Sequence, residues 1–267
     1  MDSVCDPQNE ILNPSNKQKE SKMQLEGQVA LITGGGRGIG KAMALAYAQA
    51  GADVIVVARR TDEIDAVAQA INDLGRQGVA ITCDVADRGA CETVIQKVSD
   101  RFGQLDILVN NAGGGLERKP VGEDNAETWK AVIDINLLGT YYFSRDALPL
   151  LRQSEAGKII NIGSGMGHEA RPNNSSYNCA KAAVWMLTRC MSLELWDDGI
   201  TVNEIIPGPV YTELTEDIFE QGKTHPAIPS EWVKDPDDLI PIAMFLATQA
   251  ANGPTGQSFS LARRPVC

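Results

Sequence analysis

Thr-Gly-Gly-Gly-Arg-Gly-Ile-Gly, residues 33–40, joins a short apolar run to an alanine-rich stretch with helical periodicity. The apolar run, Val29–Ile32, is typical of a buried strand, and the helical pattern opens at Lys41. A tight turn between a strand and a helix needs one or two glycines, whereas this junction has five. Glycines here let the backbone come close to a pyrophosphate, and the helix N-terminus adds free N–H groups and a positive dipole end. The stretch therefore predicts a dinucleotide-binding site.

The spacing of these glycines is Gly34-x-x-x-Gly38-x-Gly40, which differs from the common fingerprint G-x-G-x-x-G. A loose search for glycine patterns is therefore weak evidence on its own. The prediction depends on context instead, because a strand precedes the glycines and a helix follows them.

The rest of the chain alternates short apolar runs with longer amphipathic stretches. The runs expected to be strands are Val29–Ile32, Val54–Val57, Val79–Thr82, Ile107–Val109, Lys158–Ile162 and Thr201–Ile205. Continuous β-branched runs are typical of parallel strands that are buried on both faces, and a βαβα order winds a sheet with right-handed crossovers. We therefore expect an α/β fold, a single-domain Rossmann-like doubly wound parallel sheet of about seven strands with helices on both faces.

The composition bounds the organisation of the chain. A length of 267 residues with 43% hydrophobic content suits one domain with a sizeable core. Residues 1–22 are polar without apolar periodicity, which predicts a disordered tail, and residues 23–267 are expected to form the dinucleotide-binding catalytic domain. The net charge of −11 argues against nucleic acid or an anionic membrane as partner. With no apolar run near 18 residues and no signal-peptide core, we expect a soluble cytoplasmic protein.

The cysteines do not suggest a metal site or a disulfide framework. Neither a C-x-x-C pair nor a histidine-rich spacing occurs among them, so free thiols are expected. The six positions are Cys5, Cys83, Cys91, Cys179, Cys190 and Cys267.

The end of the second predicted strand indicates which dinucleotide binds. An Asp or Glu there would hold the ribose of NAD, but this chain has Arg59 and Arg60. With Arg37 of the glycine loop, they bring three guanidinium groups to the adenosine ribose, where a 2′-phosphate accepts charge-assisted hydrogen bonds. The pattern favours NADP(H). The alternative is that an arginine of the pair is solvated or bonded to Asp62 or Glu63.

Further motifs follow in order along the chain. They are Asn110-Asn111-Ala112-Gly113, Asn136, Ser164, Tyr177-x-x-x-Lys181 and Pro207-Gly208-Pro209. Together with the glycine loop, these residues resemble the short-chain dehydrogenase/reductase family over roughly residues 25–261. The interval of 13 positions from Ser164 to Tyr177 makes the resemblance specific, since Tyr-x-x-x-Lys alone occurs by chance in many helices.

The chemistry of these residues suits hydride transfer to a ketone or from a secondary alcohol. Tyr177 can give a proton to the developing alkoxide or remove one from the alcohol. Lys181, four positions later on a helix, lies on the same face, favours the phenolate and holds the nicotinamide ribose. Ser164 polarises the substrate oxygen. The resemblance implies that Asn136 carries a proton relay to the lysine, and the alternative is that it only pins a helix bulge.

The resemblance also implies the remaining cofactor contacts. They are Ile39 beside the pyrophosphate, Asp84 and Val85 around adenine, Asn111 and Gly113 along the ribose, and Pro207, Val210 and Thr212 near nicotinamide. Asp84 has an alternative role as the N-cap of a helix over Arg88–Phe102.

The substrate and the assembly are the least determined by sequence. Residues 211–232 are expected to form a lid over the site, and His168 either contacts substrate or is an ordinary surface or supporting histidine. Leu193 stands where family reductases of carrier-bound ketoacyl groups have an arginine, and the acidic surface repels an acidic carrier, so a small carbonyl compound or alcohol is favoured. Long helices near 126–153 and 175–197 suggest a homotetramer, or else a dimer. The alternatives to this activity are a 3-oxoacyl-carrier-protein reductase and a catalytically idle dinucleotide-binding redox sensor.

Overall fold

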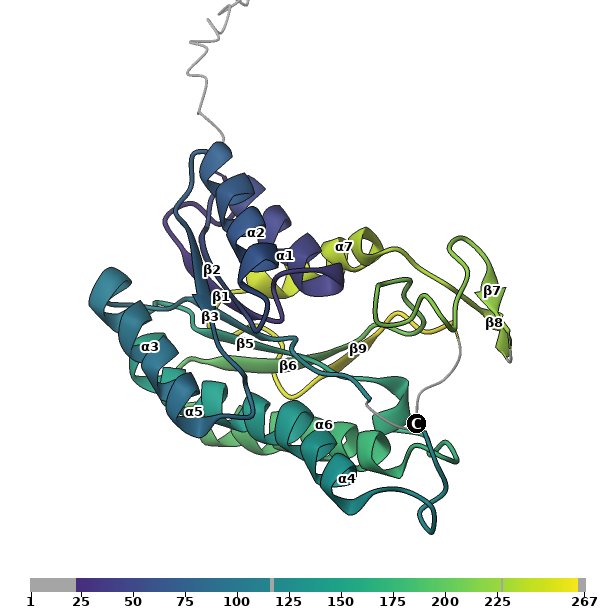
Figure 1. Ribbon diagram of the computed structural model, residues 1–267. Coiled ribbons are helices and arrows are strands. Elements are labelled where there is room, and N and C mark those ends of the chain that lie inside the picture. The colour runs from purple at the N-terminus through teal and green to yellow at the C-terminus, as the bar shows by residue number, and fades with distance from the viewer. Residues whose placement is uncertain (1–22, 116–117, 227, 264–267) are drawn as a thin grey trace, which may run out of the picture.

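A computed structural model describes residues 23–115, 118–226 and 228–263 of the chain. Its centre is a seven-stranded sheet with the order β3-β2-β1-β4-β5-β6-β9, in which every neighbouring pair is parallel (Figure 1). The strands are β1 (Val29–Thr33), β2 (Asp53–Ala58), β3 (Gly78–Thr82), β4 (Ile107–Asn110), β5 (Lys158–Ile162), β6 (Thr201–Ile206) and β9 (Ser258–Ser260). The predicted doubly wound parallel sheet is confirmed. The predicted tail, residues 1–22, lies outside the described residues.

Helices cover both faces of this sheet (Figure 1). One face carries α1 (Gly38–Gln49), α2 (Thr61–Asp73) and α7 (Ile240–Ala247). The opposite face carries α3 (Arg88–Phe102), α4 (Ala126–Ile133), α5 (Gly139–Leu151) and α6 (Ser175–Glu194). Right-handed crossovers between parallel strands place the helices in this way on an open sheet.

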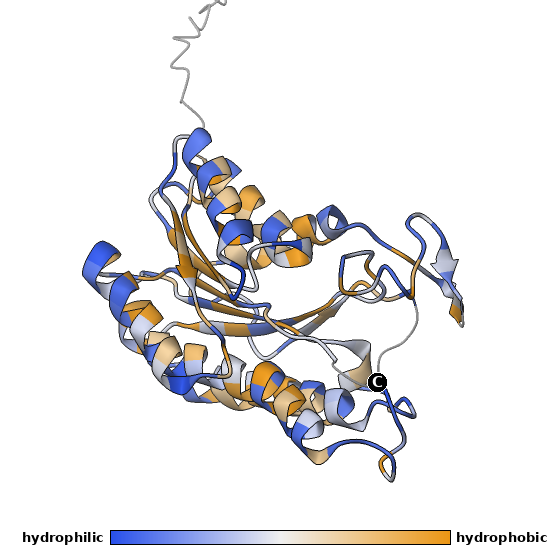
Figure 2. Ribbon diagram, in the orientation of Figure 1, coloured by the Kyte–Doolittle hydropathy of each residue, from blue (hydrophilic) through white to orange (hydrophobic). Residues whose placement is uncertain are grey.

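The strands are apolar on both sides because each side packs on a helix layer. Ile32 and Val56 belong to one hydrophobic cluster with α1, α2 and α7, whereas Leu31 and Ile55 belong to the other, with α3 and α5. Figure 2 shows the resulting apolar sheet between helices whose outer faces are hydrophilic. This double burial is why the strands read as continuous apolar runs in the sequence.

The strand order reverses at β1, which lies between β2 and β4. The helix after β1 lies on one face of the sheet and the helices after β4 lie on the other, so a crevice opens beyond the carboxyl ends of these two neighbouring strands. The glycine turn starts at that point, and the backbone N–H of Gly34 donates to the carbonyl of Val57 at 2.7 Å.

The predicted helix near 126–153 is not a regular helix throughout. A π-helical segment, η1 (Asp134–Leu138), separates α4 from α5. Such a π-turn inserts one extra residue and is frequent at functional sites. The other long helix, α6, ends at Glu194, earlier than the predicted position 197.

The segment after β6 leaves the sheet before it returns to the edge. It contains an antiparallel pair, β7 (Thr224–His225) and β8 (Ile228–Trp232), then the short helix η3 (Pro236–Leu239) and α7. The chain then adds β9 beside β6, with Ile205 opposite Phe259. Two further short elements, η2 (Gly165–Gly167) and η1, lie near the crevice. None of the helices in the described ranges is long and apolar enough to cross a membrane.

Candidate active site

A cleft of about 880 Å³ lies at the carboxyl ends of the strands. It brings together nearly every residue that the sequence predicts for the site. Those lining it are Gly34, Arg37, Gly38, Ile39, Arg59, Arg60, Asp84, Val85, Asn111, Gly113, Ser164, Tyr177, Lys181, Pro207, Val210 and Thr212. Gly40 and Asn136 do not line the cleft.

Gly40 acts within the glycine loop itself. A Cβ atom at this position would lie 2.3 Å from the carbonyl oxygen of Gly34 and 2.5 Å from Asn111 Nδ2. The amide of Asn111 donates to the carbonyls of Thr33 and Gly34 at 2.9 and 3.1 Å, so it ties β4 to the loop. A glycine at position 40 is therefore needed for the close packing of helix and loop, one of the known reasons for glycine in such turns.

The start of α1 has open hydrogen-bond donors. Arg37 occupies the N-cap position and its side chain makes no capping hydrogen bond. Gly34 and Gly38 have φ angles of +65° and +51°, which favour glycine. The first N–H groups of α1 and its positive dipole end therefore face the cleft without a side-chain partner, as anion binding at a helix N-terminus requires.

The arginines beside the adenosine end of the cleft differ in their partners. Arg60 Nη1 lies 2.8 Å from Glu63 Oε1, one turn along α2. Within the described part of the chain, Arg37 and Arg59 form no ion pair with an acidic side chain. The alternative of an arginine paired with Glu63 thus applies to Arg60, and two guanidinium groups remain available to an anion.

Ser164, Tyr177 and Lys181 converge from two elements. Ser164 follows β5, and its hydroxyl accepts from the backbone N–H of Met166 at 3.2 Å. Tyr177 and Lys181 lie on α6, where Lys181 Nζ is 5.7 Å from the centre of the tyrosine ring. Lys181 Nζ also donates to the carbonyl of Ile162 at 2.7 Å, which holds the ammonium at the end of β5.

The protonation of this group depends on burial and on nearby charges. Burial lowers the pKa of Lys181 to about 8, and the carboxylate of Glu204 opposes that shift. Burial raises the pKa of Tyr177, while a hydrogen bond with Ser164 and the positive charge of Arg118 lower it. Tyr177 is therefore a neutral phenol at pH 7 and has a proton to give.

Asn136 lies in η1 and is completely buried. Its Nδ2 group donates to the carbonyls of Val132 at 2.9 Å and Gly114 at 2.8 Å, and its Oδ1 accepts from the N–H of Gly114 at 3.0 Å. These bonds pin the π-turn to the loop after β4, which matches the alternative role. A Cβ at Gly113 would lie 2.6 Å from Asn136 Oδ1 and 3.4 Å from Lys181 Nζ, so the asparagine borders the lysine across a glycine.

Asp84 does not cap α3. The N-cap of that helix is Asp87, whose Oδ1 accepts from the N–H of Ala90 at 3.0 Å. Asp84 accepts instead from the N–H of Ala86 at 3.1 Å and lines the cleft. The N-cap alternative for Asp84 is therefore wrong.

Similar proteins identify the family. The family model for short chain dehydrogenases matches residues 28–223. A 3-oxoacyl-[acyl-carrier-protein] reductase from Synechocystis sp. is 36% identical over 89% of this chain and 96% of its own length. A 2-dehydro-3-deoxy-D-gluconate 5-dehydrogenase from Pseudoalteromonas atlantica is 38% identical over 86% of this chain and 92% of its own length. The chain belongs to the short-chain dehydrogenase/reductase family.

Solved structures of the family share the fold over nearly the whole chain. A short-chain dehydrogenase from Shigella flexneri complexed with NADP has a TM-score of 0.80 and 28% identity, covering 90% of this chain and 98% of its own. Carveol dehydrogenase from Mycobacterium avium, in complex with NAD, has the same TM-score and identity and covers 89% of this chain and 97% of its own. As a family member the protein is an oxidoreductase with a nicotinamide cofactor. Because these two neighbours differ in the dinucleotide, membership alone does not select NADP.

The predicted lid contributes the far wall of the cleft. Apolar side chains of this wall include Leu214, Phe219 and Ile228, and Glu213 and Asp217 lie among them. Thr215 Oγ1 donates to the carbonyl of Val210 at 2.6 Å, which anchors the segment at the end of β6. This part of the cleft therefore mixes apolar and acidic side chains.

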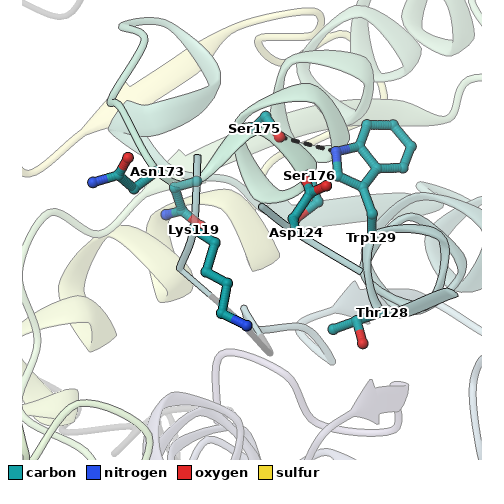
Figure 3. A pocket seen from close by; sticks show the side chains of 8 residues that line it. Lys119, Asp124, Thr128, Trp129, Asn173, Ser175 and Ser176 are labelled. Carbon is teal, nitrogen blue, oxygen red and sulfur yellow. Dashed lines mark hydrogen bonds between the residues drawn. The ribbon is translucent and has the colours of Figure 1, made fainter. Parts of the chain in front are cut away.

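A second, much smaller pocket lies between α4 and the start of α6 (Figure 3). Its volume is about 10 Å³, the space of a single water molecule. In Figure 3, Trp129 Nε1 of α4 donates to Ser175 Oγ of α6, and the bond length is 2.9 Å. This hydrogen bond braces α4 against the helix that carries Tyr177, and the pocket is too small for an organic substrate.

Sequence reasoning missed two groups at the site, Arg118 and Glu204. Arg118 lines the cleft and acts electrostatically on Tyr177, but no motif includes it. Glu204 is fully buried and is bonded to His168, whose side chain is only 5% exposed and does not line the cleft. Of the alternatives given for His168, a supporting histidine is the one that the structure bears out, because its ring bonds Glu204 and does not line the cleft. The sequence did contain a signal for Glu204, because it is a charged residue inside a run that was predicted to be a buried strand.

Proposed function

We propose that this protein is an NADP(H)-dependent oxidoreductase that transfers hydride between nicotinamide and a small ketone or secondary alcohol. The observation that carries the proposal is the meeting of Ser164, Tyr177 and Lys181 in the cleft that also contains the glycine loop and Arg59. Bound NADP(H) supplies or accepts the hydride. The open N–H groups of α1 and the glycine cradle fit its pyrophosphate.

Tyr177 acts as the general acid in reduction and as the general base in oxidation. Its neutral phenol donates a proton to the oxygen on which negative charge develops. Ser164 donates a hydrogen bond to the same oxygen and so stabilises that charge. The ammonium of Lys181 lies against the phenol ring and favours the phenolate that remains. Besides pinning the π-turn, Asn136 borders Lys181 across Gly113, and on that position we propose that it takes part in the relay that returns the proton.

The preference for NADP(H) follows from Arg37 and Arg59. A guanidinium group that lacks an acidic partner is available to a 2′-phosphate, and each bond to a phosphate oxygen is charge-assisted. Arg60 joins them by exchanging the carboxylate of Glu63 for the phosphate. Asp84 and Val85 enclose the adenine, as in the resemblance described above.

Replacing Glu63 by glutamine is expected to tighten NADPH binding about threefold and to leave NADH binding unchanged. The substitution releases Arg60 for the 2′-phosphate, which NADH lacks, and an ion pair of this kind contributes at most about 1 kcal/mol. Fluorescence titration of both dinucleotides measures the effect. Asp62→Asn is the matched control, since it removes a charge from the same first turn of α2. Equal tightening in the control would contradict the role of the Arg60–Glu63 pair.

A small free substrate is favoured over one carried by an acidic protein. Leu193 on the outer face of α6 is 79% exposed and offers an acidic carrier no charge. Of the arginines near it, Arg145 lies 3.8 Å from Asp146, and Arg189 lies over the ring of Trp185. With a net charge of −11, repulsion slows the encounter with an acidic partner. Carrier-bound 3-oxoacyl groups are the second candidate substrate, because the relative from Synechocystis is a reductase of such groups.

The deciding experiment measures dinucleotide binding first and turnover second. NADPH and NADH are titrated against the purified protein, and the tighter one is then tested with small ketones, secondary alcohols and a 3-oxoacyl carrier thioester. Tight NADPH binding with turnover of small carbonyls is the expected result. Preference for the carrier thioester would select the second candidate, and tight binding without any turnover would select an idle dinucleotide-binding protein.

We further propose a homotetramer formed through α5 and α6. Large apolar side chains are exposed on these helices and just after α6, among them Tyr141, Met186, Leu193 and Trp196. Exposed apolar side chains in such number are typical of an interface. Sedimentation equilibrium distinguishes the tetramer from the dimer, and a monomer would overturn the assignment.

A further inference from the structure

Glu204 is a buried carboxylate on the strand next to the edge of the sheet. It lies on β6, where its neighbours are Asn161 on β5 and Ser258 on β9, and its exposed fraction is 0%. Taking a carboxylate out of water is costly by several kcal/mol unless hydrogen bonds and opposite charge compensate. A charge at this place therefore requires hydrogen-bond partners or an opposite charge close by.

One oxygen of Glu204 is bonded and the other is not. Oε2 accepts from Ser258 Oγ at 2.5 Å and lies 3.0 Å from His168 Nε2. Oε1 is buried and has no hydrogen-bond partner among the described residues. His168 is held in turn by Trp185, whose ring centre lies 4.9 Å from that of the imidazole. The carboxylate thus ties the end of the turn after Ser164 to β6 and β9.

Gly163 provides the space for this carboxylate. A Cβ atom at Gly163 would lie 1.8 Å from Glu204 Oε1, so no other residue fits while Glu204 keeps its position. Gly163 directly precedes Ser164, and its N–H donates to the carbonyl of Ile205 at 2.8 Å. The free oxygen therefore lies against the backbone that carries the catalytic serine.

Lys181 brings a positive charge to the neighbourhood of this carboxylate, although the group within ion-pair distance of it is His168. The Lys181 ammonium is bonded to the carbonyl of Ile162, the residue before Gly163, and a Cβ at Gly163 would lie 1.8 Å from Glu204 Oε1, so both groups lie beside the same short stretch of backbone. The titratable groups that face this carboxylate are His168 from the end of η2 and Lys181 from α6, while β9 contributes only the hydroxyl of Ser258. Tyr177 faces Lys181 from the same helix, and Arg118 acts on Tyr177 from the loop after β4.

We infer that Glu204 is a positioning residue of the active site, which holds the turn from Gly163 to His168 and places a buried negative charge near Lys181. The catalytic role of this positioning rests on the proposed function, in which Ser164 and Lys181 act in hydride transfer. The structural part, a buried carboxylate that favours the charged form of Lys181, does not depend on the substrate.

The sign of the expected pH effect follows from the charges. Burial lowers the pKa of Lys181 to about 8, and Glu204 raises it. Removing that negative charge therefore lowers the pKa of Lys181 further. In Glu204→Gln, the ammonium loses its proton at a pH lower by about one unit, which is the scale for a nearby opposite charge. The alkaline limb of the pH–rate profile for ketone reduction shifts down with it.

The test combines a direct titration with a rate profile. Lysine side chains are labelled with ¹³C, and the Lys181 signal, identified by its absence in Lys181→Arg, is followed with pH in the cofactor-free protein. Ser258→Ala is the matched control, because it removes a hydrogen bond to the same carboxylate but keeps its charge. We expect the Lys181 midpoint to fall by about one unit in Glu204→Gln and by much less in Ser258→Ala. Equal midpoints in wild type and Glu204→Gln, or equal shifts in both variants, would overturn the inference.

A pair of substitutions tests the fit of Gly163 and keeps the experiment decisive if Glu204→Gln does not fold. Gly163→Ala alone is expected to lower the unfolding temperature, because its methyl group meets the carboxylate. Adding Glu204→Ala removes the clash and restores much of the loss, and the Lys181 titration is then repeated on the double variant. Additive losses would contradict the contact. A shifted Lys181 midpoint without turnover of any substrate would retain this inference and reject the proposed function.

Discussion

Tyr177→Phe is expected to reduce turnover at least about 1,000-fold with either direction of hydride transfer. The phenylalanine keeps the ring that packs over Lys181 but has no hydroxyl to give or take the proton. A loss of this size corresponds to about 4 kcal/mol of transition-state stabilisation. Steady-state rates measure the loss, and fluorescence titration checks that NADPH affinity stays within about twofold.

Tyr141→Phe is the matched control for this substitution. Tyr141 lies on α5, is 42% exposed and does not line the cleft, so the same loss of a hydroxyl is expected to leave turnover unchanged. Retained turnover in Tyr177→Phe would reject the assignment of Tyr177 as acid and base. Loss of both turnover and NADPH affinity would point to a damaged cleft instead.

Charge reversal at Arg59 and Arg60 is expected to weaken NADPH binding about 100-fold and NADH binding less than about threefold. Two charge-assisted hydrogen bonds to a 2′-phosphate are lost, and together they contribute about 3 kcal/mol. NADH has no phosphate at this position, so it loses little. The dissociation constants of both dinucleotides for Arg59→Glu/Arg60→Glu measure the difference directly.

The control for this pair must change the net charge equally. Lys97→Glu/Arg101→Glu makes the same change in net charge on α3, outside the cleft. It tests whether NADPH binding is weakened only by the long-range electrostatic field of the added negative charges. Raising the salt concentration reduces such a field contribution further. Two results would refute a phosphate site at Arg59 and Arg60. One is that Arg59→Glu/Arg60→Glu weakens the binding of NADPH and NADH to a similar extent, and the other is that both double variants weaken NADPH binding equally.

The positions of the strands and of the glycine loop were predictable because they depend on local pattern. A parallel strand that is buried on both faces reads as a continuous apolar run, so Val29–Ile32 and Val54–Val57 were located within a residue of β1 and β2. Tyr177 and Lys181 share a helix face by spacing alone. A helix bulge at Asn136 was only an alternative in the sequence analysis, and the extent of η1 could not be predicted, since a π-turn is stabilised by tertiary bonds such as those of Asn136 to Gly114.

The sequence by itself thus determined the doubly wound sheet, the dinucleotide loop and the catalytic candidates, because periodicity and spacing encode them locally. Only the tertiary structure decided which partner each polar group has. Arg60 bonds Glu63 while Arg59 stays available, and Glu204 meets His168, 36 residues away in the chain. That contact depends on the parallel register that sets Asn161 opposite Glu204 and on the space left by Gly163. Long-range register and side-chain volume act together there, and neither is visible in a local stretch of sequence.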